Sequence, residues 1–102
     1  MSIARLAATI EARKSADDSQ SWTAKLLSSG PEKCAEKFGE EAVEAIIEAV
    51  KGDAEKLTAE AADVIYHLLV MCAARGVTLD QIEAELARRE GTSGVAEKAS
   101  RG

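Results

Sequence analysis

Acidic side chains at helical spacing are the residues in this chain best suited to chemistry. Glu41 and Glu44 stand three positions apart, and Glu60 and Asp63 repeat that spacing after fifteen intervening residues. Residues three or four positions apart lie on the same face of a helix. Each pair therefore predicts two carboxylates side by side, and Glu40 adds a further acid next to the first pair.

The connection between the two acidic segments is short enough to decide how they meet. Apolar periodicity predicts a helix over residues 31–51, with Pro31 in the first turn, where proline is favoured. A second helix is predicted over residues 54–75, capped by Asp53. Because only Gly52 and Asp53 separate them, the two helices are expected to be antiparallel neighbours.

Counted outward from this turn, the acids fall at matching heights. Glu44 lies eight residues before Gly52, and Glu60 lies seven after Asp53. Glu41 and Asp63 lie eleven before and ten after the same positions. Four carboxylates at one level repel strongly in a site of low dielectric constant, and a hard divalent cation with oxygen ligands removes that cost.

Magnesium is the cation that this set of ligands favours. No histidine or cysteine stands at a usable ligand spacing, which disfavours zinc. Mg²⁺ keeps part of its water shell and binds phosphate oxygens, so the expected substrate carries phosphates. Two alternatives to a metal site stay open: a solvated acidic face on residues 31–51, and a structural network in which lysines neutralise the acids.

The helix predicted over residues 54–75 is apolar on nearly all sides, which predicts that it is buried. Between residues 61 and 74, only Asp63 and His67 are polar. Buried carboxylates are rare unless they are paired or bound to metal, which favours a site over a solvated face. His67 taken alone is interpreted as a core histidine with its hydrogen bonds satisfied.

Three small residues are interpreted as packing residues. Gly39 lies inside the helix over 31–51, where glycine costs about 1 kcal/mol relative to alanine. It allows either close helix approach, which we expect, or room for a ligand beside Glu40. Cys34 and Cys72 are expected to be reduced residues of the core.

Shorter helices complete the expected fold. They cover residues 2–14, residues 22–27 with Ser21 as the cap, and residues 78–90 with a capping box formed by Thr78 and Gln81. No strand-like alternation or internal repeat is present. The predicted fold is all-α: an antiparallel bundle of about five helices, in one domain over residues 1–102, with an irregular tail over 92–102.

The composition indicates a globular chain with a thin core. Of its 102 residues, 46% are hydrophobic but only 3% are aromatic, so burial against a second copy is expected. The formal net charge of −5 argues against binding to nucleic acid. No signal peptide follows Met1 and no apolar run reaches transmembrane length, so a cytoplasmic protein without membrane contact is expected.

The motifs around the acids resemble those of a known family. Glu40-Glu41-x-x-Glu44 followed by Glu60-x-x-Asp63 is similar to the signature of the MazG-like all-α nucleoside-triphosphate pyrophosphatases. Resemblance to the phosphoribosyl-ATP pyrophosphatase family within that group is carried by further motifs: Ser21-Trp22-Thr23-x-x-Leu26, Gly30-Pro31-x-Lys33, Lys37-x-Gly39, Tyr66-His67-Leu68-Leu69, and an ending that runs from Arg88 to Arg101. The likeness covers essentially the whole chain.

The resemblance implies hydrolysis of phosphoribosyl-ATP to phosphoribosyl-AMP and pyrophosphate, the second step of histidine biosynthesis. It also implies a homodimer and a separate cyclohydrolase for the next step. By motif position, the Mg²⁺ ligands are Glu41, Glu44, Glu60 and Asp63. The catalytic carboxylates are expected to be Glu40 and Glu44, and the candidates for binding the remaining phosphates are Lys33, Lys37, Lys98 and Arg101. The small-residue segment 91–94 is expected to order over bound substrate.

Two rival functions stay open at this point. One is a house-cleaning pyrophosphohydrolase of the same superfamily that acts on non-standard nucleotides. The other is a non-enzymatic helical interaction module, for which the polar stripe on an otherwise apolar helix is poorly suited.

Overall fold

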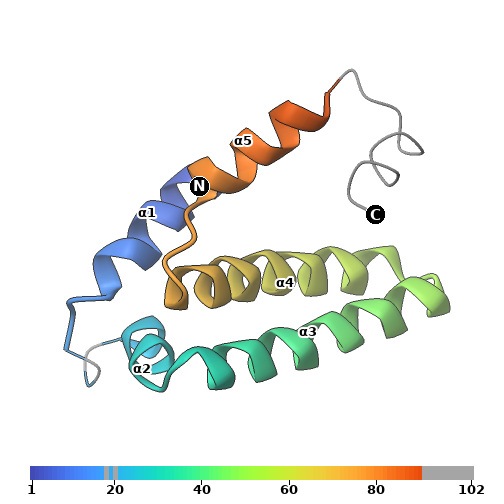
Figure 1. The fold of residues 1–102 in the computed structure, drawn as a ribbon. Helices are drawn as coiled ribbons and strands as arrows, with labels where there is room; N and C mark the ends of the chain where they lie inside the picture. The colour runs from blue at the N-terminus through green and yellow to red at the C-terminus, as the bar shows by residue number, and fades with distance from the viewer. Residues whose placement is uncertain (18, 20, 91–102) are drawn as a thin grey trace.

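Five helices make up the computed structural model, which describes residues 1–17, 19 and 21–90 (Figure 1). In chain order they are α1 (Ile3–Arg13), α2 (Trp22–Ser28), α3 (Pro31–Lys51), α4 (Ala54–Ala74) and α5 (Leu79–Arg89). No strand occurs within these described residues, so the all-α prediction is confirmed. The predicted irregular tail over 92–102 lies outside them.

The helices begin at the residues that the capping pattern predicted. The side chain of Ser21 accepts a hydrogen bond from the backbone N–H of Ala24, and Asp53 accepts one from Lys56. Thr78 starts α5 with the expected capping box. These side chains satisfy N–H groups that the first helical turn leaves without partners, which is why each helix starts where it does.

The two long helices form an antiparallel hairpin, and they lie side by side along their length (Figure 1). Gly52 adopts a left-handed conformation with φ of +79°, which ends α3 and lets Asp53 begin α4 at once. Glycine reaches this region without the steric penalty that other residues incur. The predicted hairpin is therefore confirmed, and its register is set by a two-residue turn.

The core lies at the open end of the hairpin, away from the turn. There α1 and α2 pack against the second half of α4 and bury the following side chains: Ile10, Leu26, Cys34, Leu69, Val70 and Ala73. Cys34 is fully buried and donates a hydrogen bond from Sγ to the carbonyl of Leu26. Both cysteines are free thiols, as predicted, although Cys72 is only partly buried.

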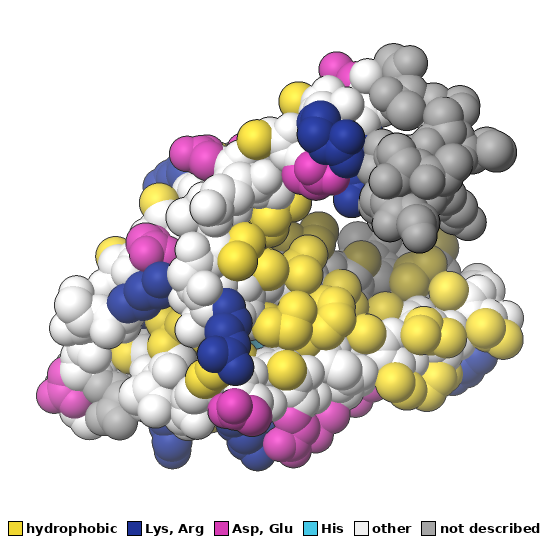
Figure 2. Space-filling view, in the orientation of Figure 1, with side chains coloured by type: hydrophobic (Ala, Val, Ile, Leu, Met, Phe, Trp, Pro, Cys, Tyr) yellow, Lys and Arg dark blue, Asp and Glu magenta, His cyan; other side chains and the backbone are white. Residues whose placement is uncertain are grey.

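The prediction that α4 is buried on nearly all sides was wrong for this chain taken alone. Its buried residues are confined to the half near the core, and Ile65 on the remaining part is exposed. The reason is that α1 and α2 are too short to cover the whole hairpin, while α5 leans away from it and buries no residue (Figure 1). Hydrophobic side chains consequently gather on the surface of the hairpin facing α5 (Figure 2).

Two further sequence interpretations need correction. By length and composition α4 could cross a membrane, contrary to our expectation that no segment reaches that length, although helices of soluble cores meet the same criterion. At Gly39, an added Cβ would meet no atom within 4 Å. Close helix packing therefore does not explain this glycine, and the space beside it is open.

Substitution by alanine should have opposite effects on stability at Gly39, within α3, and at Gly52, which ends α3. Gly39→Ala should raise the free energy of unfolding by up to about 1 kcal/mol, because alanine favours the helix and finds room there. Gly52→Ala should lower it by about 1–2 kcal/mol, because a φ of +79° strains a residue with a Cβ. Urea unfolding followed by circular dichroism measures both values. A destabilised Gly39→Ala variant would contradict the open space beside this residue.

Candidate metal centre between α3 and α4

Carboxylates from both legs of the hairpin meet in one cluster. One carboxylate oxygen each from Glu41 on α3 and from Glu60 and Asp63 on α4 lie within 4.8 Å of one another. Glu44, one turn along α3 from Glu41, acts electrostatically on both Glu41 and Glu60. The structure therefore brings three of the four predicted ligands together, in the register that counting from the turn indicated, with the exposed Glu44 beside them.

Ionisation is unfavourable for two of the clustered acids, Glu41 and Glu60. The pKa of Glu41 is raised above its ordinary value by burial first, and then by the charges of Glu44 and Asp63. Burial also raises the pKa of Glu60, followed by the charge of Glu44. Both carboxyl groups thus retain protons more firmly than free glutamic acid, because burial disfavours the charged form and ionisation also places like charges side by side.

Lysine and arginine side chains in the described part of the chain do not relieve this repulsion. Among the residues that the structure describes, no lysine or arginine forms an ion pair with any of the four acids: Glu41, Glu44, Glu60 and Asp63. In addition, Glu60 Oε2 is shielded from solvent and has no hydrogen-bond partner within the described part of the chain. A divalent cation with oxygen ligands fits both observations, whereas the structural network of lysines and acids does not.

Glu48 is an acidic residue that was not among the predicted site residues. It lies one further turn along the stripe of Glu41 and Glu44, and its side chain is largely buried. Its Oε1 atom lacks a hydrogen bond from the described residues, and its ion-pair partner is Lys51, with Nζ at 3.8 Å. The spacing of seven residues from Glu41 is the signal that could have identified it.

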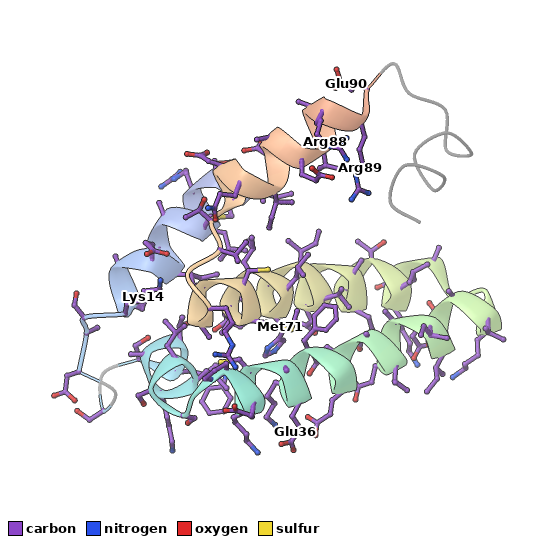
Figure 3. All side chains as sticks on the ribbon, in the orientation of Figure 1. Lys14, Glu36, Met71, Arg88, Arg89 and Glu90 are labelled. Carbon is purple, nitrogen blue, oxygen red and sulfur yellow. The ribbon has the colours of Figure 1, made fainter. Side chains whose placement is uncertain are left out.

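The other predicted site residues of α3 form ion pairs outside the cluster. Glu40 pairs with Lys37 at 3.4 Å, and Lys33 pairs with Glu36 at 3.5 Å, each within one turn of the same helix. Glu36 points outward from α3, away from α4 (Figure 3). Glu40 is therefore next to the cluster in sequence, but its carboxylate is held by a lysine outside it.

Cationic residues near the end of the described chain are also engaged. Arg88 and Arg89 both bind Glu85 within α5, at 2.8 and 2.9 Å, and hold the pKa of Glu85 at about 2 (Figure 3). The two remaining predicted phosphate-binding residues, Lys98 and Arg101, and the segment 91–94 lie outside the described residues.

Comparison with known proteins gives one consistent result. Residues 3–90 match the family model described as phosphoribosyl-ATP pyrophosphohydrolase. A phosphoribosyl-ATP pyrophosphatase of Cereibacter sphaeroides is 76% identical over 98 residues, which cover 96% of this chain and 95% of that protein. A protein of the same name from Jannaschia sp. is 77% identical, and the match covers 95% of this chain and 95% of that protein. Another from Dinoroseobacter shibae is 76% identical, with 97% of each chain covered.

The repulsion in the cluster should be measurable as a pH-dependent cost to stability. In buffer containing EDTA, Glu41→Gln should raise the melting temperature at pH 7 and leave it nearly unchanged at pH 4. A carboxyl group with a raised pKa keeps its proton more firmly in the folded than in the unfolded state, so stability falls as pH rises above the ordinary value of 4.5. Below that value, the group is protonated in both states.

Differential scanning calorimetry at the two pH values measures this difference. Glu83→Gln, an exposed change of the same kind on α5, is the matched control and should shift the melting temperature equally at both pH values. An equal shift for Glu41→Gln would show that its carboxyl group is not strained by its neighbours.

Proposed function

The chain belongs to the phosphoribosyl-ATP pyrophosphohydrolase family, and we propose that it hydrolyses phosphoribosyl-ATP with Mg²⁺ held between α3 and α4. Family membership makes the protein a hydrolase, which excludes the non-enzymatic interaction module. The single observation that supports the site is the meeting of Glu41, Glu60 and Asp63 without a lysine or arginine partner from the described residues.

The proposed ligands of Mg²⁺ are the four clustered acids, Glu41, Glu44, Glu60 and Asp63. When bound, the ion supplies neutralisation of the negative charge that develops on the pyrophosphate leaving group. The protein holds these carboxylates in fixed positions on two helices joined by a short turn, so little reorganisation is needed during the reaction.

The remaining chemistry is attack by water on a phosphorus atom. A new P–O bond forms from the water oxygen, the anhydride bond between the first and second phosphate groups breaks, and the proton of the water passes to a carboxylate. Glu44 is the better placed of the two proposed bases, because it acts electrostatically on both Glu41 and Glu60. Glu40 would have to leave Lys37 before it could orient the water.

The substrate's remaining phosphates require cations near the cluster. We assign this role to Lys33 and Lys37, which lie two turns and one turn before Glu41 on α3, together with Lys98 and Arg101. The ion pairs of both α3 lysines are solvent-exposed, and exposed pairs contribute only about 0–1 kcal/mol. A phosphate can therefore replace the glutamates as partner at small cost.

An apolar surface supports the proposed homodimer. On α3, four aliphatic side chains are exposed: Val43, Ile46, Ile47 and Val50, with Val50 at 84% and Ile46 at 60%. Ile65 on α4 and Leu86 on α5 add to the exposed apolar area. Apolar area of this extent marks an interface, and a second copy is the occupant that the small core of a 102-residue chain favours.

The cellular setting follows from the substrate. We place the enzyme at the second step of histidine biosynthesis in the cytoplasm, with a separate cyclohydrolase taking its product. The rival within the superfamily is a house-cleaning enzyme for non-standard nucleotides. Pyrophosphate release from phosphoribosyl-ATP, compared with release from a panel of free nucleoside triphosphates, distinguishes the two.

Loss of a single ligand should abolish most of the activity without unfolding the protein. Asp63→Asn and Glu44→Gln should each reduce pyrophosphate release from phosphoribosyl-ATP by at least about 100-fold, as should removal of Mg²⁺ with EDTA. A coupled pyrophosphate assay measures the rates, and circular dichroism verifies the fold. Glu55→Gln, an exposed change at the start of α4, is the control and should retain full turnover. Wild-type rates in Asp63→Asn would refute the ligand assignment.

A charge placed in the exposed apolar surface should disrupt the dimer. Ile46→Glu is expected to shift sedimentation from a dimer to a monomer at micromolar concentration, because the buried charge would lack a partner. Analytical ultracentrifugation measures the change. A parent protein that sediments as a monomer at all concentrations would exclude the proposed dimer.

A further inference from the structure

His67 is a buried polar residue to which the proposed reaction assigns no task. The residue is only 8% exposed, and its Nδ1 atom is shielded from solvent without a hydrogen-bond partner among the described residues. The sequence predicted a core histidine with its hydrogen bonds satisfied. The predicted burial is confirmed, but Nδ1 has no hydrogen-bond partner among the described residues, so this part of the prediction was wrong. A buried polar group without a hydrogen-bond partner opposes folding, so the imidazole lowers the stability of the protein.

The imidazole lies beside the acidic cluster. His67 follows Asp63 by four residues on α4, which places the two on one face of the helix, a turn apart. Across the hairpin, an electrostatic effect of His67 lowers the pKa of Glu41, opposite to the effects of burial, Glu44 and Asp63. His67 is therefore the basic group next to this carboxylate, in a cluster that no described lysine or arginine joins.

The neighbours of His67 restrict how its ring can turn. The ring of Tyr66 meets it edge to face, with centroids 4.9 Å apart and an interplanar angle of 79°. Tyr66 is in turn anchored to α2 by a hydrogen bond between its hydroxyl group and Thr23 Oγ1. Leu69 and Val70, which follow on α4, belong to the packed core. An imidazole confined in this way can hold a neighbouring carboxylate in one orientation.

We propose that His67 is a positioning residue that orients the carboxylate of Glu41 for cation binding, by donating an imidazole N–H to one oxygen while the other oxygen faces Glu60 and Asp63. This inference rests on the proposed function. Carboxylates that bind metal are commonly held by such outer hydrogen bonds, whose loss weakens metal affinity by about 10–100-fold. The role requires only a donor beside Glu41, which a neutral imidazole supplies.

The proposal predicts that stability and cation affinity change in opposite directions. His67→Phe keeps a ring against Tyr66 but removes both nitrogens, so its melting temperature in EDTA should equal or exceed that of the parent. Its dissociation constant for Mn²⁺, used as a calorimetric probe in place of Mg²⁺, should rise by about 10–100-fold. His67→Gln, which restores an N–H donor, should recover most of the affinity.

Isothermal titration calorimetry on the full chain without substrate provides this readout, independently of turnover. Ile10→Ala, a change in a fully buried residue of α1, is the control: it should lower the melting temperature and leave the Mn²⁺ affinity unchanged. Parent-like affinity in His67→Phe would overturn the positioning role alone. Absence of Mn²⁺ and Mg²⁺ binding to the parent protein would instead overturn the proposed function, and the positioning role with it.

Discussion

Repulsion among carboxylates that the backbone holds together is the interaction around which this molecule is organised. Glu41 and Glu44 cannot move away from Glu60 and Asp63 without breaking the hairpin, because each pair is fixed on a long continuous helix. The pKa values of Glu41 and Glu60 are raised, first by burial and then by the charges of the neighbouring acids. In the proposed function, a doubly charged ion held by these groups would offset their repulsion, and occupancy of the site would then be coupled to stability.

The arrangement needs a rigid hairpin, and the remainder of the described fold supplies it from one end. The turn closes one end of α3 and α4, and the core built from α1, α2 and the second half of α4 clamps the other. The acids lie between these two constraints. Covering only one end leaves Ile46, Val50 and Ile65 exposed, so the same small set of helices that positions the site also creates the apolar surface proposed to bind a second copy.

Local chemistry explains what the sequence could predict. Ser21, Asp53 and Thr78 marked helix starts because a capping side chain acts on backbone within three residues of itself. The meeting of Glu44 with Glu60 followed from counting residues on either side of a turn too short to allow another arrangement. Both inferences depend on distances along the chain, which the sequence states directly.

The features that could not be predicted from the sequence depend instead on what lies across from a residue. Apolar residues on all sides of α4 indicate that burial of this helix is favourable. They do not indicate whether the covering surface belongs to the same chain, and within this chain Ile65 is exposed. The open space at Gly39, the pairing of Glu40 with Lys37 and the unsatisfied Nδ1 of His67 are likewise matters of side-chain direction. Helical spacing places each residue on a face without determining its partner.

The two-residue turn also restricts how this chain can change in length. One residue inserted between Gly52 and Asp53 would rotate one helix by about 100° against the other and slide it by about 1.5 Å, which would turn Glu60 and Asp63 away from Glu41. The connection between α1, which ends at Arg13, and α2, which begins at Trp22, is longer than this turn. Insertions and deletions should therefore be accommodated readily before α2 and excluded from the tip of the hairpin.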